Sequence, residues 1–131
     1  MFGLAVVALA LQRNGLEELL AAVLPDGTGL LALLGVAAVA AVVANLLNNL
    51  PATLALLPVA ATGSVPTLLA VLVGVNLGPN LTYVGSLANL LWRRVVGHRA
   101  PEPLAFSLVG LVTVPLTLLA ATAALWLSLQ V

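Results

Sequence analysis

The stretch NLLNNLPATLALLP, residues 45–58, places three asparagines and two prolines inside the most apolar part of the chain. Between Gly27 and Trp92 no side chain carries a charge, and Tyr83 is the sole ionisable group. Asparagine competes for backbone hydrogen bonds and proline lacks a backbone N–H, so both interrupt apolar helices. The stretch therefore predicts a break in helical structure deep inside an apolar region.

The composition assigns the chain to the membrane proteins. Of its 131 residues, 63% are hydrophobic and 6% are charged, and the mean hydropathy is +1.24. A soluble domain carries about 25% charged residues. The formal net charge is zero and cysteine is absent, which argues against nucleic-acid binding, disulfides and thiolate metal sites. No nucleophile–base pair or metal cluster is visible, so we expect no enzyme activity, no cofactor and the lipid bilayer as a partner.

Leu30–Leu47 predicts a transmembrane segment or the first arm of a hairpin, and Leu104–Leu127 predicts a full span, because a spanning helix needs about 20 residues. The apolar pieces between these two segments, Pro51–Leu57, Pro66–Val75 and Leu81–Val96, are shorter. They are separated by the breaks NNLP and NLGPN. Hydrophobic length alone would suggest three spans between Gly27 and Trp92, but the breaks argue against them. Non-helical backbone at membrane depth survives only inside protein or beside a watery cavity. Short apolar helices on both sides of such breaks are typical of the discontinuous helices of transporters.

The charged residues predict the orientation of the chain. Arg93, Arg94 and Arg99 lie together before Glu102. By the positive-inside rule, we expect the loop over residues 93–102 to be cytoplasmic in a multi-pass protein of the cell membrane.

Two segments carry a family resemblance, ANLLNNLPATLALLPVA at 44–60 and GVNLGPNLTYVGSLANLLWRRVV at 74–96. In this order they resemble the arsenical pump membrane proteins, the arsenite permease family of the ion transporter superfamily. The resemblance covers Leu16–Leu127 and corresponds only to the C-terminal part of a family member. The apolar run Phe2–Leu11, half a span long, likewise suggests a fragment or a late start.

The resemblance implies an all-α membrane protein, one inverted repeat of the superfamily fold. Within a single transmembrane domain over 1–131, it implies a re-entrant hairpin over 28–62, a broken helix over 66–96 and a last span over 104–127. The hairpin tip and the broken helix together would form half of a substrate and ion site. The first motif carried over by match holds Asn48, Asn49, Pro51 and Thr53. The second holds Asn76, Gly78, Pro79, Asn80, Thr82, Gly85 and Ser86, with Pro51 and Pro79 as the helix-breaking residues.

The family implies export of arsenite or antimonite, by exchange with protons or with an ATPase subunit as partner. It also implies that a missing N-terminal repeat, or a second copy of the chain, supplies the other half of the site. Arsenite at neutral pH is the uncharged As(OH)₃, and neutral amides such as those of Asn48, Asn49 and Asn80 both donate and accept hydrogen bonds. Helix N-termini after Asn49 and Asn80 would add free N–H groups. Carbonyls freed at each break would be available to coordinate a cation.

Three alternatives remain open from the residues. The same fold in this superfamily serves sodium/proton antiporters and dicarboxylate carriers, although a charge-free stretch suits their charged ligands poorly. A membrane scaffold without transport would place ordinary interhelical loops at the two breaks. The asparagines would then only cap helices at the membrane surface, and Ser86 and Asn89 would serve helix packing.

Overall fold

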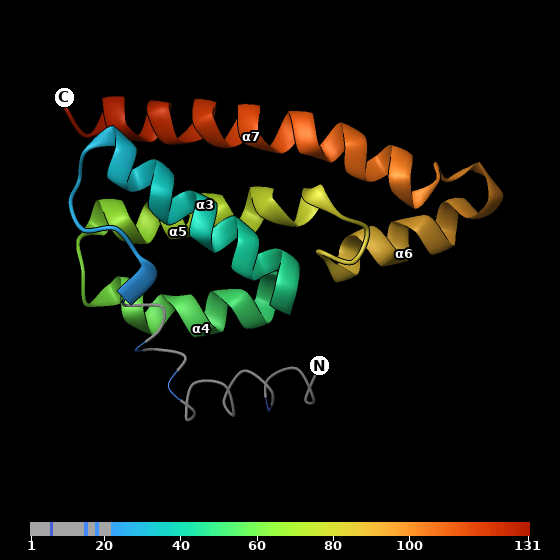
Figure 1. Ribbon diagram of the computed structural model, residues 1–131, viewed down its shortest axis with the longest axis horizontal. Helices are drawn as coiled ribbons and strands as arrows, with labels where there is room; N and C mark the ends of the chain where they lie inside the picture. Colours follow the sequence, from blue (N-terminus) through green and yellow to red (C-terminus); the bar gives the residue numbers. More distant parts are fainter. Residues whose placement is uncertain (1–5, 7–14, 16–17, 19–21) are drawn as a thin grey trace.

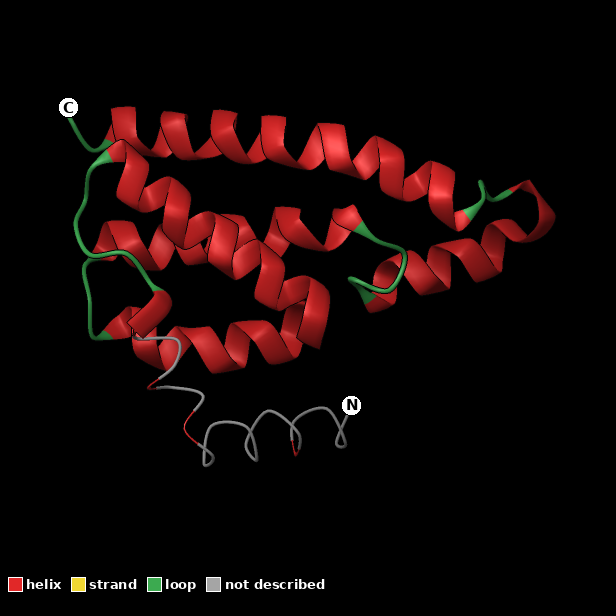
Figure 2. Cartoon of the chain, viewed as in Figure 1, coloured by secondary structure: helices red, strands yellow, loops and turns green. Residues whose placement is uncertain are grey.

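The computed structural model describes Val6, Gly15, Glu18 and residues 22–131, and within these residues every regular element is helical (Figures 1 and 2). The apolar run at the N-terminus lies almost entirely outside the described residues. The predicted all-α class is confirmed for the described part. The long helices α3 and α7 are apolar enough to cross a membrane.

Helices α3 (Leu30–Leu47) and α4 (Asn49–Ala61) form a hairpin with only Asn48 between them. Its backbone angles, φ 76° and ψ 157°, reverse the chain in a region that glycine alone adopts readily. The Asn48 side-chain Oδ1 accepts a hydrogen bond from the Asn49 backbone N–H at 2.8 Å, which caps α4. The apolar piece expected to stop before Pro58 continues to Ala61. The exposed Pro58 removes one backbone donor without ending the helix.

The next helix is interrupted in the middle. α5 (Val65–Leu77) passes into the short 3-10 helix η2 (Gly78–Leu81), and α6 (Leu87–Val96) begins only after an irregular segment over residues 82–86. The expectation that helix resumes at Leu81 is therefore wrong. The position of Ser86 explains the delay, because its Oγ accepts from the Asn89 backbone N–H at 3.0 Å and caps the first turn of α6.

α7 (Pro103–Ser128) returns along the whole length of this interrupted helix (Figure 1). It follows the short 3-10 helix η3 (Gly97–Arg99). With 26 residues it is about 39 Å long, whereas the 13-residue helices α4 and α5 are each about 20 Å. The hydrocarbon core is about 30 Å thick. Of α4, α5 and α7, only α7 is thus long enough to cross the hydrocarbon core alone.

Helices α3 and α5 pack through small residues. A Cβ atom added to Gly74 would lie 2.2 Å from the Ala37 carbonyl oxygen, and one added to Gly78 would lie 2.4 Å from the Ala41 Cα. The two glycines are four residues apart, the spacing that lets membrane helices approach closely. The contact fixes the register of α3 against α5. The buried residues of α3 are Leu33, Val36, Ala37, Ala40, Ala41 and Ala44.

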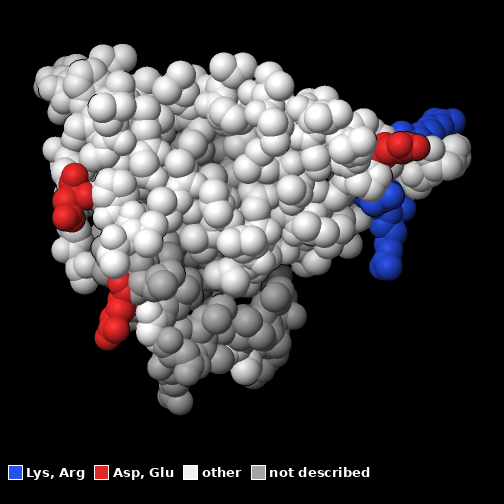
Figure 3. All heavy atoms as spheres, in the orientation of Figure 1, with Lys and Arg blue, Asp and Glu red and all other residues white. Residues whose placement is uncertain are grey.

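The described charged side chains lie at the two ends of the long axis, with uncharged surface of described residues between them on the face drawn in Figure 3. The described charges at the α6–α7 end are Arg93, Arg94, Arg99 and Glu102. Between the ends, α7 exposes large apolar side chains such as Leu108, Leu111 and Leu116, at 58%, 65% and 61% of their surface. An apolar belt between two polar ends is the surface expected of a protein in a bilayer.

Candidate functional site

The amide of Asn45 joins the hairpin to the helix break. Asn45 lies in the last turn of α3, and its Nδ2 donates to the Gly78 carbonyl at 2.5 Å and to the Ala41 carbonyl at 3.0 Å. Its Oδ1 accepts a hydrogen bond from the Thr82 hydroxyl at 3.0 Å. Gly78 begins the 3-10 helix η2 and Thr82 follows it, so this one partly buried side chain pairs with groups at both ends of that short helix.

Gly85 gives this amide its space. A Cβ atom on Gly85 would lie 2.7 Å from the Asn45 Oδ1 and 2.4 Å from the Pro79 carbonyl oxygen. Any side chain at position 85 would therefore push against the Asn45 amide or the backbone of the break. This gives a packing reason for the glycine of the second motif.

A second side-chain amide, that of Asn89 in α6, also donates hydrogen bonds to backbone carbonyls of the break. Its Nδ2 donates to the Pro79 carbonyl at 3.0 Å and to the Thr82 carbonyl at 3.3 Å. The carbonyls of Gly78, Pro79 and Thr82 therefore all accept hydrogen bonds from side-chain amides. Each of these three carbonyls at the break thus already has a partner within the protein.

The hairpin tip presents amide groups with spare donors. The Thr53 hydroxyl donates to the Asn49 carbonyl at 2.9 Å and approaches the Asn49 Oδ1 at 3.4 Å. Among the described residues, neither Asn48 nor Asn49 finds an acceptor for its Nδ2. Both residues are half-buried. The tip thus holds neutral donors that a polar solute would satisfy.

The strained backbone of Asn48 gives a testable result at the tip. Asn48→Gly relieves about 1–3 kcal/mol of strain but loses the cap on Asn49, which contributes about 1 kcal/mol, so its stability should stay within about 1–2 kcal/mol of the original. Asn48→Ala keeps the strain and loses the cap, so it should be about 1–2 kcal/mol less stable than the original. Unfolding in mixed micelles of increasing denaturing detergent measures both variants. Equal stability of the alanine and glycine variants would contradict the strained conformation.

The remaining predicted residues lie apart from the Asn45 amide. Asn76 is exposed and its Nδ2 donates to the Leu72 carbonyl of its own helix at 2.7 Å, beside an apolar groove between α5 and α7. Asn80 is exposed, and its backbone lies close to Gly110 of α7. A Cβ atom added to Gly110 would lie 2.5 Å from the Asn80 backbone oxygen. The helix N-terminus expected after Asn80 is in fact at Leu87, with Ser86 as its cap. Pro51 and Pro79 are both buried.

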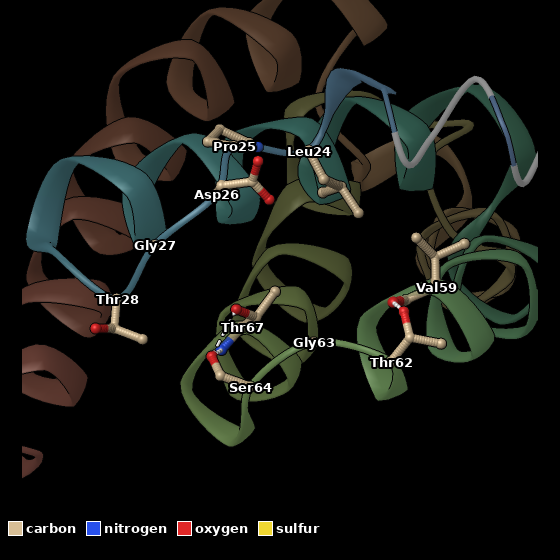
Figure 4. A pocket seen from close by; sticks show the side chains of 10 residues that line it. All are labelled: Leu24, Pro25, Asp26, Gly27, Thr28, Val59, Thr62, Gly63, Ser64 and Thr67. Atoms are coloured by element: carbon tan, nitrogen blue, oxygen red, sulfur yellow. Dashed lines mark hydrogen bonds between the residues drawn. The ribbon is translucent and has the colours of Figure 1, made fainter.

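A cavity of about 340 Å³ with a mixed polar and apolar lining lies at the opposite end of the hairpin (Figure 4). It is lined by residues from the segment before α3, the end of α4 and the start of α5. Figure 4 shows the hydroxyl groups of Ser64 and Thr67 hydrogen bonded to each other there. The cavity contains none of the residues of the two motifs. Its lining residues are Leu24, Pro25, Asp26, Gly27, Thr28, Val59, Thr62, Gly63, Ser64 and Thr67.

Asn45 was not among the residues predicted for the site, although it opens the quoted stretch. A signal for it exists in the sequence. Asn45 follows Ala37 and Ala41 at steps of four, so it continues the small-residue stripe of α3 that packs on α5. A polar residue on such a stripe faces a neighbouring helix rather than lipid.

The sequence profile of the arsenical pump membrane proteins matches residues 1–129 of the chain. The chain belongs to this family. The resemblance carried by the two motifs is thereby confirmed. Membership of this family implies that the chain is a membrane transporter of arsenicals rather than an enzyme. No solved structure matches the chain.

Proposed function

We propose that this chain supplies a binding half-site for As(OH)₃ and its antimony analogue in a secondary exporter that exchanges them for protons. The half-site is the hairpin tip, formed by Asn48, Asn49 and Thr53. The amide of Asn45, one helical turn away, holds the tip against the break. The single observation that carries the proposal is the pair of half-buried amides at the tip whose Nδ2 donors have no acceptor among the described residues.

The chemistry of the tip suits an uncharged polyhydroxylated solute. The stretch around it has no ionisable side chain other than Tyr83 between Gly27 and Trp92. Burying a charge there without a partner would cost several kcal/mol, whereas a neutral trihydroxide gives and takes hydrogen bonds with amides. The hydroxyl oxygen of Thr53 and the Oδ1 of Asn49, which lie 3.4 Å apart, add two hydrogen-bond acceptors.

The break itself is a poor site for a bare cation, which distinguishes this proposal from sodium exchange. A sodium ion at the break would need carbonyl oxygens, and those of Gly78, Pro79 and Thr82 accept amide hydrogen bonds. Dicarboxylate uptake would need positive groups at the tip, and among the described residues the arginines nearest to it in the sequence, Arg93 and Arg94, lie in the last turn of α6.

The helix lengths support an arrangement in the membrane. We propose that α3 and α4 form the re-entrant hairpin of the region 28–62, and that α5, η2 and α6 form the broken helix of the region 66–96. Helices α4 and α5, each about 20 Å long, cover about two thirds of a 30 Å core. Their shared ends, the tip and the break, would then lie at membrane depth. In this arrangement residues 93–102 face the cytoplasm and residues 104–127 form the last span.

Equilibrium dialysis of the purified chain with radioactive arsenite tests the half-site. We expect Asn49→Ala to weaken arsenite binding about tenfold, because one hydrogen bond to a bound solute contributes about 1 kcal/mol and the amide makes more than one. The matched control is Asn76→Ala, which removes an exposed amide bonded to its own helix and should leave binding within twofold. Sodium chloride should not compete with arsenite.

Two results would overturn the half-site. The first is an equal loss of arsenite binding in the Asn49 and Asn76 variants. The second is failure of the original chain to retain arsenite while its unfolding in detergent remains cooperative. Expression of the same variants in cells that lack an arsenite exporter then compares binding with resistance.

A further inference from the structure

Helix α6 exposes an apolar stripe that ends in an arginine. None of its residues is buried. Leu87, Leu90 and Leu91 expose 44%, 40% and 54% of their surface, and Arg94 is also exposed. The spacing of these residues, i, i+3, i+4 and i+7, places them on one face of the helix. They line a groove of about 590 Å³ together with Arg93 and Gly97.

The lining of this groove includes two arginines and no acidic residue. The Arg93 guanidinium lies over the Tyr83 ring, 4.7 Å from its centroid. Arg94 has no ion-pair or ring partner in the part of the chain that the structure describes. Figure 3 shows basic side chains gathered at this end of the molecule, with one patch of acidic surface directly beside them on the face drawn. The groove thus combines three exposed leucines with a free guanidinium.

Aromatic contacts hold α6 in place beside the start of α7. Tyr83 stacks on Phe106 with ring centroids 4.4 Å apart, and Trp92 lies 6.4 Å from the same ring. The Tyr83 hydroxyl donates to the Pro101 carbonyl. Aromatic residues of this kind gather at the boundary between hydrocarbon and headgroups. With the aromatic residues at such a boundary, the leucines would lie on its hydrocarbon side and Arg94 at headgroup level.

We propose that this groove binds an anionic phospholipid, with the phosphate on Arg94 and an acyl chain along Leu87, Leu90 and Leu91. An anionic lipid complements both the charge and the apolar stripe. A zwitterionic lipid leaves the net positive charge of the groove in place, and free phosphate leaves the leucines uncovered. Basic grooves beside membrane helices on the cytoplasmic side recognise anionic headgroups by this chemistry.

Fluorescence quenching in bilayers tests the site. The chain has two tryptophans, so Trp126→Phe leaves Trp92 of α6 as the only reporter. This variant is reconstituted in phosphatidylcholine bilayers that contain either brominated phosphatidylglycerol or brominated phosphatidylcholine at equal mole fractions. We expect Trp92 to report about a fivefold preference for the anionic lipid, the ratio given by one arginine near the surface.

Two arginine variants separate a site from diffuse charge. Arg94→Gln should lower the preference about fivefold, and Arg94→Lys should restore most of it. Arg99→Gln, which changes the net charge equally but does not line the groove, should keep the preference within twofold. Equal loss in the Arg94→Gln and Arg99→Gln variants would overturn the site in favour of diffuse attraction. No preference in the original chain, or loss of quenching on addition of glycerol phosphate, would also overturn it.

Discussion

Asn45→Ala is expected to destabilise the protein by about 1–3 kcal/mol and to abolish measurable arsenite binding. The substitution removes an amide that bonds to Gly78 and Thr82 across the helix interface. Interhelical hydrogen bonds in membranes contribute about 0.6 kcal/mol on average and about 1.7 kcal/mol at most, and two are lost here. The Gly78 carbonyl, buried at the break, also loses its amide partner. Unfolding in mixed micelles measures the first effect and dialysis the second.

A double-mutant cycle with Thr82→Val isolates the contact between the two side chains. If the Thr82 hydroxyl and the Asn45 Oδ1 interact as their 3.0 Å separation indicates, the two substitutions should be non-additive by at least about 0.5 kcal/mol. The control is Asn76→Ala, whose amide bonds only within its own helix and should cost less than about 0.5 kcal/mol. Strict additivity, or an Asn76 effect as large as that of Asn45, would contradict the proposed role of Asn45.

The all-helical class and the position of the break follow from local features of the sequence. The long apolar runs predict α3 and α7 because length alone decides whether a helix can cross a bilayer. The break begins at Gly78 because Pro79 cannot donate to the preceding turn. The break proves longer than expected, because Ser86 and Asn89 form a capping pair that sets the start of α6 at Leu87.

The partners of Asn45 depend on tertiary structure. They follow from the register of α3 against α5, and that register depends on which alanines meet Gly74 and Gly78. A sequence motif also does not show on which face of a helix each of its residues lies. Asn76 lies midway between those two glycines, so it points about 200° away from them, towards the groove beside α7. Assigning the asparagines to one site by motif therefore grouped residues that lie on different faces of the helix.

The contact between α3 and α5 leads to the other large effect, in Gly74→Ala. Its new Cβ atom would lie 2.2 Å from the Ala37 carbonyl oxygen, closer than any real contact. Backbone cannot rotate away as a side chain can, so α3 must shift. Overpacking of this kind costs about 1–3 kcal/mol, and the shift also draws Asn45 away from the Gly78 carbonyl, so we expect at least about 3 kcal/mol in total.

Two further variants test this origin of the effect. Gly29→Ala adds the same methyl group where no atom lies within 4 Å, so its stability should change by less than about 0.5 kcal/mol. Ala40→Gly removes a side chain 2.6 Å from the new Cβ but leaves the nearer Ala37 carbonyl in place. It should therefore fail to rescue Gly74→Ala in the detergent unfolding assay. Full rescue would show that side-chain crowding, rather than the approach of the two backbones, sets the register that brings Asn45 to the break.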